Sequence, residues 1–486
     1  MKGKKAVAVA AAALLSATAV GAMAGCKSKA DYTIRVLLLA NDTEGEFYAQ
    51  YFDDLEEELK EEGLSVEIKY NGYEEGDYYT MLDTEIGKDS IPDIFYLRPN
   101  EILQYKDQIA NLQEYADNQS DVDLTAIYES ALNMYRFNPT TKELGNPNDD
   151  LYAFPKDLST QQLGYNKTLL SQAENAVHAL TPSLKMPYEA GFTGYTWAEY
   201  KQVCETVKAT LGAGKYASEV PSLEILAKSF SSDKSMTTSP LIDMSQGREN
   251  AQIGGFGSND PIYKAIQYQA EMIASGAASN VEGYSNFTGG KMAFYGLIGS
   301  WEVADYDTYL GEGNWGVMPW PTVTHDAGEV WQGLIKSAGY VVSKNCVEAK
   351  VTDEDGNEVA SKKGDIAKRI AISFMSSKTQ NQLMRGKISL PLVKAWRTDY
   401  EDPANNGQYA PASRSVFMDV ISGEHGFFPA TYSTFNSDWL NYLTRKDGEI
   451  DLILRAGTGA VTKFNETTWT DVRNTMQQRY DDVKNS

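Results

Sequence analysis

The chain has 486 residues, of which 42% are hydrophobic and 23% are charged. At roughly 100 to 200 residues per domain, this length provides two to four domains or one large two-lobed unit with a real core. The composition excludes collagen, low-complexity disorder and small disulfide-stapled folds. With 44 Lys and Arg against 67 Asp and Glu, the chain has no overall positive field for phosphates, so we do not expect it to bind nucleic acid.

The first 25 residues have the order of a secretory signal peptide. A short cationic segment at residues 1–5 precedes an apolar run at residues 6–20. That run of about fifteen residues is shorter than the roughly twenty that a transmembrane helix needs. We therefore predict that residues 1–25 are removed and that the mature protein lies outside the cytoplasm.

Residues 22–26, Ala-Met-Ala-Gly-Cys, resemble the bacterial lipobox, although Met23 stands where leucine is usual. The resemblance implies that Cys26 is lipidated, that residues 26–30 form a linker and that the protein faces outwards from a bacterial cell membrane. Because the remaining chain is acidic and is repelled by an anionic surface, the lipid should be its membrane contact. The alternative is that Cys26 is an unmodified cysteine in an ordinary signal peptide.

The mature chain begins with alternating strand and helix patterns. Residues 32–39 are a β-rich apolar run and residues 65–70 alternate between apolar and polar, so both predict strands. Helical spacing of apolar residues follows each of them, at 48–59 and 77–88, and a buried strand is predicted at 91–97. This order predicts an α/β fold with βαβ units on a mainly parallel sheet.

Polar residues directly follow the first and third predicted strands. Ligands of open α/β sheets bind at the carboxyl ends of strands, near the point where the strand order reverses. These positions therefore supply the first candidate contacts: Asn41, Asp42, Thr43 and Glu44, and then Arg98, Asn100 and Glu101.

Other local patterns predict turns and buried thiols. The polar residues 138–150 indicate a turn cluster. Alternating acids at residues 353–358 resemble a calcium loop, but their glycine and glutamate spacing fails the EF-hand pattern, so we predict a surface hairpin or turn between Val351 and Val359. Cys204, in a helical pattern, and Cys346 are expected to be buried and unpaired.

Catalytic and metal-binding signatures are scarce. The three histidines, His178, His325 and His425, have no obvious cysteine, histidine or acid at metal-ligand spacing. No G-x-S-x-G, P-loop or H-E-x-x-H motif is present. We therefore expect no metal site, no cofactor and no catalytic residue. Paired acids of a glycoside hydrolase stay open, because their separation depends on the fold and not on spacing.

Aromatic residues are the positive feature of the sequence. The chain has 30 Tyr, 16 Phe and 8 Trp, and many lie in polar, loop-like surroundings. The flat C–H faces of sugars stack on aromatic rings, and their hydroxyl groups bind carboxylates, amides and guanidinium groups. A groove with both kinds of group is typical of carbohydrate binding, although most single rings are core residues.

Six sequence blocks occur in order along the mature chain. They are the P-D strand at 91–94, the crossing segment at 151–167, the T-W-x-E segment at 196–200, the F-x-x-G-K and G-S-W segment at 287–301, the W-G-V-x-P segment at 315–321, and the return strand at 333–345. Thr196, which opens the third block, is also a good N-cap for a helix. Together and in this order, the blocks resemble the extracellular solute-binding proteins of family 1, the sugar-binding lipoproteins of ABC importers.

The resemblance implies a two-lobed periplasmic-binding-protein-like fold of type II, with a ligand cleft between the lobes and several chain crossings at the hinge. Lobe 1 would comprise 31–153 and 336–388, and lobe 2 would comprise 154–335 and 389–486. The hinge would use 153–157, 331–339 and 386–391. The implied partners are an oligosaccharide and the permease subunits of an ABC transporter, and the protein is expected to act as a monomer.

The resemblance also implies candidate ligand contacts. Trp301 matches the tryptophan of the G-S-W block, which commonly stacks on a sugar ring. Ser159 stands where the maltodextrin-binding member of the family has a glutamate, so that hydrogen-bond set is not inherited. The C-terminal run at 427–432 could supply another ring or belong to a helix core. The contacts that the resemblance adds are Asp157, Ser159, Thr160, Gln161, Trp301, Trp331, Gln332 and Tyr432.

Three alternatives remain open. The same fold could bind another solute, such as a peptide, a polyamine or ferric ion. Ferric ion sites of this shape use adjacent tyrosines, and Tyr78 and Tyr79 are adjacent, but their helical pattern predicts packing. The chain could also be a carbohydrate-active enzyme, or an envelope scaffold without a ligand.

Overall fold

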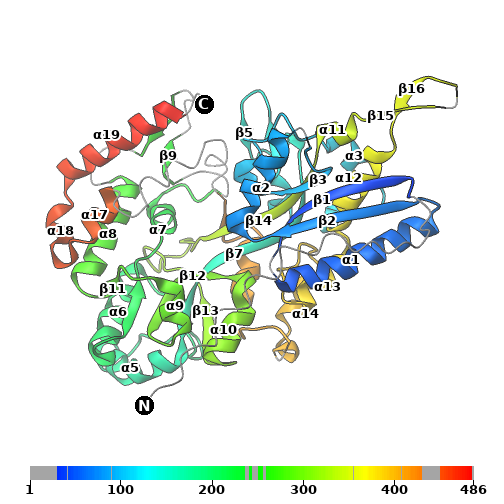
Figure 1. The fold of residues 1–486 in the computed structure, drawn as a ribbon. Coiled ribbons are helices and arrows are strands. Elements are labelled where there is room, and N and C mark those ends of the chain that lie inside the picture. Colours follow the sequence, from blue (N-terminus) through cyan, green and yellow to red (C-terminus); the bar gives the residue numbers. More distant parts are fainter. Residues whose placement is uncertain are drawn as a thin grey trace, which may run out of the picture.

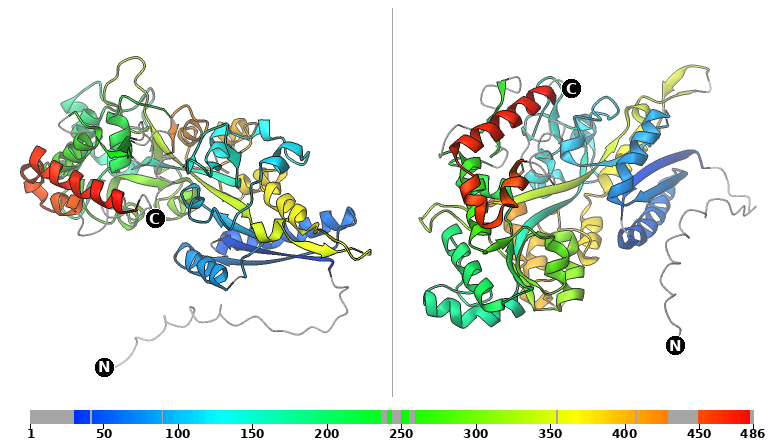
Figure 2. Two further views of the ribbon diagram at one scale, coloured as in Figure 1. Left: turned by 90° about the horizontal axis from the view of Figure 1, so that it is seen from above. Right: turned by 60° about the vertical axis from the view of Figure 1, so that its left-hand side comes forward.

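The computed structural model describes residues 30–483, except 41, 89, 236–239, 244–249, 255–258, 354, 407 and 429–448. The predicted lipidation site Cys26 and the candidate contacts Asn41 and Tyr432 lie outside the described residues. Two bodies of mixed helix and strand are joined through a central sheet (Figures 1 and 2). The predicted α/β class is therefore confirmed.

In the described residues one large sheet dominates, with small two- and three-stranded sheets beside it. The path of the large sheet is β11-β8-β12-β7-β14-β3-β1-β2, with β13 paired to β7 and β17 paired to β14. Its strands are β1 (Tyr32–Leu39), β2 (Val66–Tyr73), β3 (Ile94–Leu97), β7 (Phe154–Asn166), β8 (Tyr216–Glu219), β11 (Ala278–Ser279), β12 (Met292–Gly299), β13 (Trp315–Met318), β14 (Gly333–Val342) and β17 (Gly426–Phe427). The remaining strands are β4 (Arg136–Asn138), β5 (Glu143–Leu144), β6 (Asp150–Leu151), β9 (Ile242–Asp243), β10 (Gln252–Ile253), β15 (Lys350–Thr352) and β16 (Glu358–Ala360).

Helices cover both parts of this sheet. Those in the first half of the chain are α1 (Asp42–Glu61), α2 (Glu75–Gly87), α3 (Gln113–Asn118), α4 (Glu129–Asn133), α5 (Lys167–Leu180), α6 (Trp197–Leu211) and α7 (Leu223–Phe230). Those in the second half are α8 (Pro261–Ala274), α9 (Gly283–Thr288), α10 (Val303–Leu310), α11 (Lys344–Val347), α12 (Lys363–Ser373), α13 (Ser377–Arg385), α14 (Trp396–Glu401), α15 (Ser415–Ile421), α17 (Glu449–Leu454), α18 (Ala460–Lys463) and α19 (Glu466–Val483). Among the described helices, none combines the length and the apolar character that crossing a bilayer requires.

The predicted N-terminal βαβ units are confirmed. β1 lies between β2 and β3 and is parallel to both. On α1, the side chains of Tyr48, Phe52 and Leu59 are buried, because their spacing places them on the helix face that packs against the sheet.

Two long antiparallel strands, β7 and β14, connect the two bodies, and we call this pair the crossing. The first half of β7 pairs with β14, and its second half pairs with β12 and β13. β14 pairs with β17 at its beginning and with β3 at its end. One continuous sheet therefore runs from the first body into the second (Figure 1).

The buried hydrophobic residues form two clusters. One contains β1, β2, β3 and the helices packed on them, and extends to residues 287–317 and 390–421. The other contains α5 to α8 and the C-terminal helices α17 to α19. We call the body that contains β1, β2 and β3 lobe 1, and the body that contains β8, β11, β12 and α5 to α8 lobe 2. Residues 390–421 pack in the first cluster, and the lobe boundaries given above stay a prediction.

Three local predictions are confirmed. β15 and β16 pair as a hairpin around Gly356, which projects from lobe 1 at the upper right of Figure 1. Cys204 and Cys346 are buried and unpaired. Thr196 caps α6, because its hydroxyl accepts a hydrogen bond from the N–H of Glu199, whose carboxylate accepts one from the N–H of Thr196.

The Thr196 cap allows a test of this local structure. We expect Thr196→Ala to lower the free energy of unfolding by about 1 kcal/mol, because the N–H of Glu199 loses the hydroxyl that accepts its hydrogen bond. Urea denaturation of the full chain measures this loss. Thr210→Ala is the matched control, since Thr210 is exposed on the same helix and its hydroxyl donates to the Thr206 carbonyl within that helix. Equal losses in the two variants would contradict the capping role.

Candidate functional site

The carboxyl ends of parallel strands from both lobes point towards the crossing. In lobe 1, β1 and β3 are parallel, and Leu97 at the end of β3 pairs with Gly339 in the middle region of β14. In lobe 2, β8 and β12 are parallel, and Gly299 at the end of β12 pairs with Gln161 of β7. Ligand sites of α/β proteins lie outside such strand ends, so the crossing is the candidate site.

A bulge in β7 gathers polar side chains on one face of the crossing. Ala338 pairs with Asp157 and the next residue, Gly339, pairs with Pro155, so β7 has one extra residue, Lys156, at this point. A bulge of this kind redirects side chains and is common beside functional sites. It explains why the neighbouring residues Lys156 and Asp157 can interact, with 3.4 Å between Nζ and the carboxylate.

Beyond the bulge, β7 alternates in the manner of a strand. Asp157, Ser159 and Gln161 are half-buried, whereas the Thr160 side chain between them is fully buried. Successive side chains point to opposite faces of a sheet, so Thr160 lies on the other face, where Gln162 donates a hydrogen bond to its hydroxyl. Lys336 of β14 pairs with Ser159 and is exposed. We call the face with Asp157, Ser159, Gln161 and Lys336 the site face.

Lys156 is a buried cation bound to two carboxylates. Its Nζ lies 2.9 Å from Glu44 of α1 and 5.7 Å from the centre of the Tyr48 ring. Burial opposes its charge, but Tyr48, Glu44 and Asp157 together hold the pKa of Lys156 well above its usual range. Burial raises the pKa of Asp157, and Lys156 and a hydrogen bond from the Ala338 N–H oppose that rise.

The residues after β3 form a second polar group. The N–H of Arg98 donates to the Glu101 carboxylate at 2.7 Å, and the Tyr79 hydroxyl donates to the same carboxylate. The Arg98 side chain donates to the Tyr96 hydroxyl at 3.3 Å. Burial raises the pKa of Tyr96, and Arg98 opposes this rise. Asn100 is exposed.

Trp301 lies on the lobe 2 side of the crossing. It follows β12 in a short 3₁₀ turn (Ser300–Glu302) and is 42% exposed. Nζ of Lys336 lies 5.9 Å from the centre of its ring, within the range of a cation–π contact. An indole ring with this exposure beside a cation and half-buried polar side chains offers a stacking surface.

The other predicted contacts are more enclosed. Trp331 is half-buried, and one face of its ring stacks on His425 at 4.4 Å between centres. Gln332 is only 4% exposed. Asp42 is the first residue of α1, and its side chain is outside the described set.

Two acids that the sequence analysis did not select lie near the same strand ends. Glu219 ends β8, and its carboxylate accepts a hydrogen bond from the Gly296 N–H at 2.7 Å. Burial raises the pKa of Glu219 to about 8. Burial likewise raises the pKa of Glu224, in α7, to about 7, against the effect of Lys336. Polar residues at the carboxyl end of a strand were the criterion that selected Asn41 and Arg98. The same criterion, applied to the strand at 216–219, could have indicated Glu219 and Glu224.

Two hollows of the surface lie away from the site face. One, lined by Ser300, Val303 and Leu390, is beside the crossing, and the other, lined by Tyr51, Glu58 and Thr379, lies between α1 and α13. Neither includes a predicted ligand contact.

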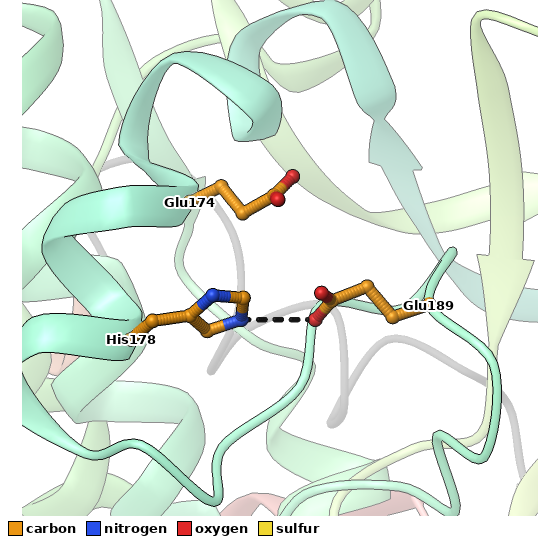
Figure 3. Close-up of side chains that lie close together, drawn as sticks. All are labelled: Glu174, His178 and Glu189. Carbon is orange, nitrogen blue, oxygen red and sulfur yellow. Dashed lines mark hydrogen bonds and ion pairs between the residues drawn. The ribbon is translucent and has the colours of Figure 1, made fainter.

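One group of possible metal ligands lies on lobe 2. The sequence analysis found no acid at metal spacing from a histidine, but this overlooked Glu174, four residues before His178 on α5. The structure also brings Glu189 to them, and the three ligand atoms lie within 4.8 Å of one another (Figure 3).

The buried cation at the bulge can be tested by substitution. We expect Lys156→Met to lower the free energy of unfolding at neutral pH by about 3 kcal/mol, because Glu44 and Asp157 lose their counter-charge. The pKa of Asp157 should then rise further. When folding raises the pKa of a carboxyl group, the free energy of unfolding falls as pH increases from the pKa in the unfolded chain to the pKa in the fold. The loss should therefore be larger at about pH 7 than at about pH 4 in urea denaturation, and a pH-independent loss would contradict this account.

The buried Glu219 predicts a different pH dependence. Its pKa rises from 4.5 in the unfolded chain to about 8 in the fold, so the wild type should lose stability as pH increases between these values. Glu219→Gln keeps the acceptor for the Gly296 N–H and removes the ionisation. We expect the variant to gain stability relative to the wild type over this interval and to show no further change above about pH 8. Urea denaturation across the interval measures the difference, and parallel curves would refute it.

The sequence and the structure were compared with those of known proteins. A sequence search of curated proteins found no match. Among solved structures, Lmo0181 of Listeria monocytogenes, an ABC substrate-binding protein in complex with cycloalternan, aligns over 92% of this chain and 98% of its own, with a TM-score of 0.60 and 14% identity. The sugar-binding protein MalE of Xanthomonas citri aligns over 93% and 97%, with a TM-score of 0.62 and 19% identity.

The cyclic α-maltosyl-1,6-maltose binding protein of Arthrobacter globiformis is similar over 93% of this chain and 99% of its own, with a TM-score of 0.62 and 14% identity. These likenesses show the two-lobed solute-binding fold. The sequence model of the bacterial extracellular solute-binding proteins matches residues 40–354, more than half of the chain. The chain therefore belongs to the family of bacterial extracellular solute-binding proteins.

Proposed function

We propose that this protein binds a carbohydrate, most simply an oligosaccharide, at the site face and delivers it to the permease subunits of an ABC importer. The exposed indole ring of Trp301 beside Lys336 is the observation that carries this proposal. The C–H face of a sugar ring stacks on such a surface. The three structural relatives named above are described as binding cycloalternan, sugar and cyclic maltosyl-maltose, respectively, which supports the same ligand class here.

Polar groups near the crossing suit a ligand rich in hydroxyl groups. Oε1 of Glu224 is buried and has no hydrogen-bond partner among the described residues, so it is an unsatisfied acceptor on the lobe 2 side. Asp157 and Glu101 supply further carboxylate oxygens on the lobe 1 side. Hydrogen bonds between carboxylates and hydroxyls are stronger than those between neutral groups.

The crossing provides a mechanism for capture. β7 and β14 connect the lobes. Leu390 forms an isolated bridge with Leu158 of β7. The proposed hinge, 153–157, 331–339 and 386–391, consists of parts of these two strands and of the segment around Leu390. In the proposed division, 31–153 with 336–388 closes against 154–335 with 389–486. A ligand that contacts both lobes favours the closed form, which the permease then recognises.

The remaining parts of the proposal concern the setting of the protein. Residues 1–25 direct export, and lipid at Cys26 anchors the mature monomer to the outer face of the membrane. The protein acts by binding and release and performs no chemistry on the sugar. Product formation from an oligosaccharide by the purified protein would favour a carbohydrate-active enzyme instead. A thermal-shift screen with sugars, amino compounds and ferric ion separates the proposal from a peptide, polyamine or iron binder.

Stacking on Trp301 is tested by substitution. We expect intrinsic tryptophan fluorescence to change saturably with an oligosaccharide from a panel, and Trp301→Ala to weaken binding by about 1 to 3 kcal/mol, by analogy with base–aromatic stacking. Tyr309→Ala is the control, since Tyr309 is 62% exposed and is not a proposed contact. Unchanged affinity in Trp301→Ala would remove the stacking assignment. A panel in which no sugar binds would refute the proposed function.

A further inference from the structure

We propose that Glu174, His178 and Glu189 form a surface site for a divalent transition-metal ion of the Zn²⁺ class, separate from the sugar site. Glu174 and His178 are four residues apart on α5 and therefore lie on the same face of the helix. Glu189 lies in the loop that follows α5, and its side chain points back to them (Figure 3). One ligand atom from each residue lies within 4.8 Å of the other two.

The chemistry of the three side chains defines the class of ion. His178 presents Nε2 to the Glu189 carboxylate at 3.0 Å. Imidazole nitrogen is a ligand for Zn²⁺ and its neighbours, whereas Ca²⁺ and Mg²⁺ prefer sites made of oxygen. One imidazole and two carboxylates supply three protein ligands, and the fourth position of a tetrahedral ion is then open to water.

Neighbouring groups hold the two carboxylates in place. The Tyr188 hydroxyl donates to Glu174 at 2.9 Å, and the N–H of Met186 donates to Glu189 at 2.5 Å. Hydrogen bonds of this kind orient metal ligands and reduce the reorganisation that binding requires. His178 and Glu189 retain side-chain exposures of 33% and 26%, so an ion can reach them from solvent.

A second histidine–glutamate pair provides the contrast. His325 contacts Glu199 at 2.7 Å between Nε2 and the carboxylate. As at Glu189, the same carboxylate oxygen also accepts a hydrogen bond from a backbone N–H, here that of Thr196. Among the described residues, a group of three metal-ligating side chains occurs only around His178. The His178 site therefore has the third ligand that an isolated ion pair lacks.

Binding at this site would attach the loop after α5 to the helix. The loop is already packed on lobe 2, since Met186 and Tyr195 are buried in its core. Because the site comprises α5 and this loop and not the site face, its ion should stabilise lobe 2 and leave sugar affinity unchanged. This inference does not depend on the proposed function.

The test is a titration of the mature full chain, purified without a histidine tag, with Co²⁺ and Zn²⁺. We expect one equivalent of Co²⁺ to produce visible absorption bands of a low-coordinate site, which Zn²⁺ then abolishes by competition. His178→Gln, Glu174→Gln and Glu189→Gln should each weaken Co²⁺ binding by roughly tenfold or more. His325→Gln is the matched control and should leave it unchanged.

Several results would overturn the proposal. They are the absence of saturable binding at micromolar metal, binding that His178→Gln leaves unchanged, and equal weakening in His325→Gln. Circular dichroism of each variant establishes that it is folded. Glu174→Gln keeps the His178–Glu189 pair, so its weaker binding cannot be attributed to loss of that pair.

Discussion

The antiparallel pairing of β7 with β14 is the constraint on which the rest of this structure depends. It places both lobes on one sheet and directs the carboxyl ends of β3 and β12 to the same crossing. β14 lies close to the Tyr135 side chain at Gly339, where a Cβ atom would lie 2.5 Å from the ring. A side chain at this position would therefore push β14 away from its neighbours, and only glycine permits the observed packing.

Charge is balanced at the same point of the fold. The bulge at Lys156 removes one residue from the regular pairing and places a cation between Glu44 of lobe 1 and Asp157 of the crossing. A buried charge is tolerated only when it is paired. The contact joins α1 to a strand that continues into lobe 2, so the electrostatics of the site and the connection between the lobes depend on the same residues.

Much of the fold, and less of the site, could be predicted from the sequence. Local patterns sufficed for the strand at 32–39, the Thr196 cap, the hairpin at 353–358 and the buried thiols, because each depends on neighbouring residues. The site required the register of strands distant in sequence. Lys336 joins Ser159 only through that register, and alternation along β7 turns Thr160 away from its predicted neighbours. Glu189 approaches His178 through a loop whose path the sequence does not reveal.

The pairing of β3 with β14 also has a consequence for how the chain folds. Leu97 pairs with Gly339. The first parallel strands therefore cannot complete their sheet until a segment more than two hundred residues further along the chain has been synthesised. Contacts between such distant segments slow folding, because the intervening chain loses conformational entropy before the favourable free energy of strand pairing is gained. Until β14 pairs with β3, this edge of β3 is unpaired. The nascent chain is most prone to aggregate during this interval.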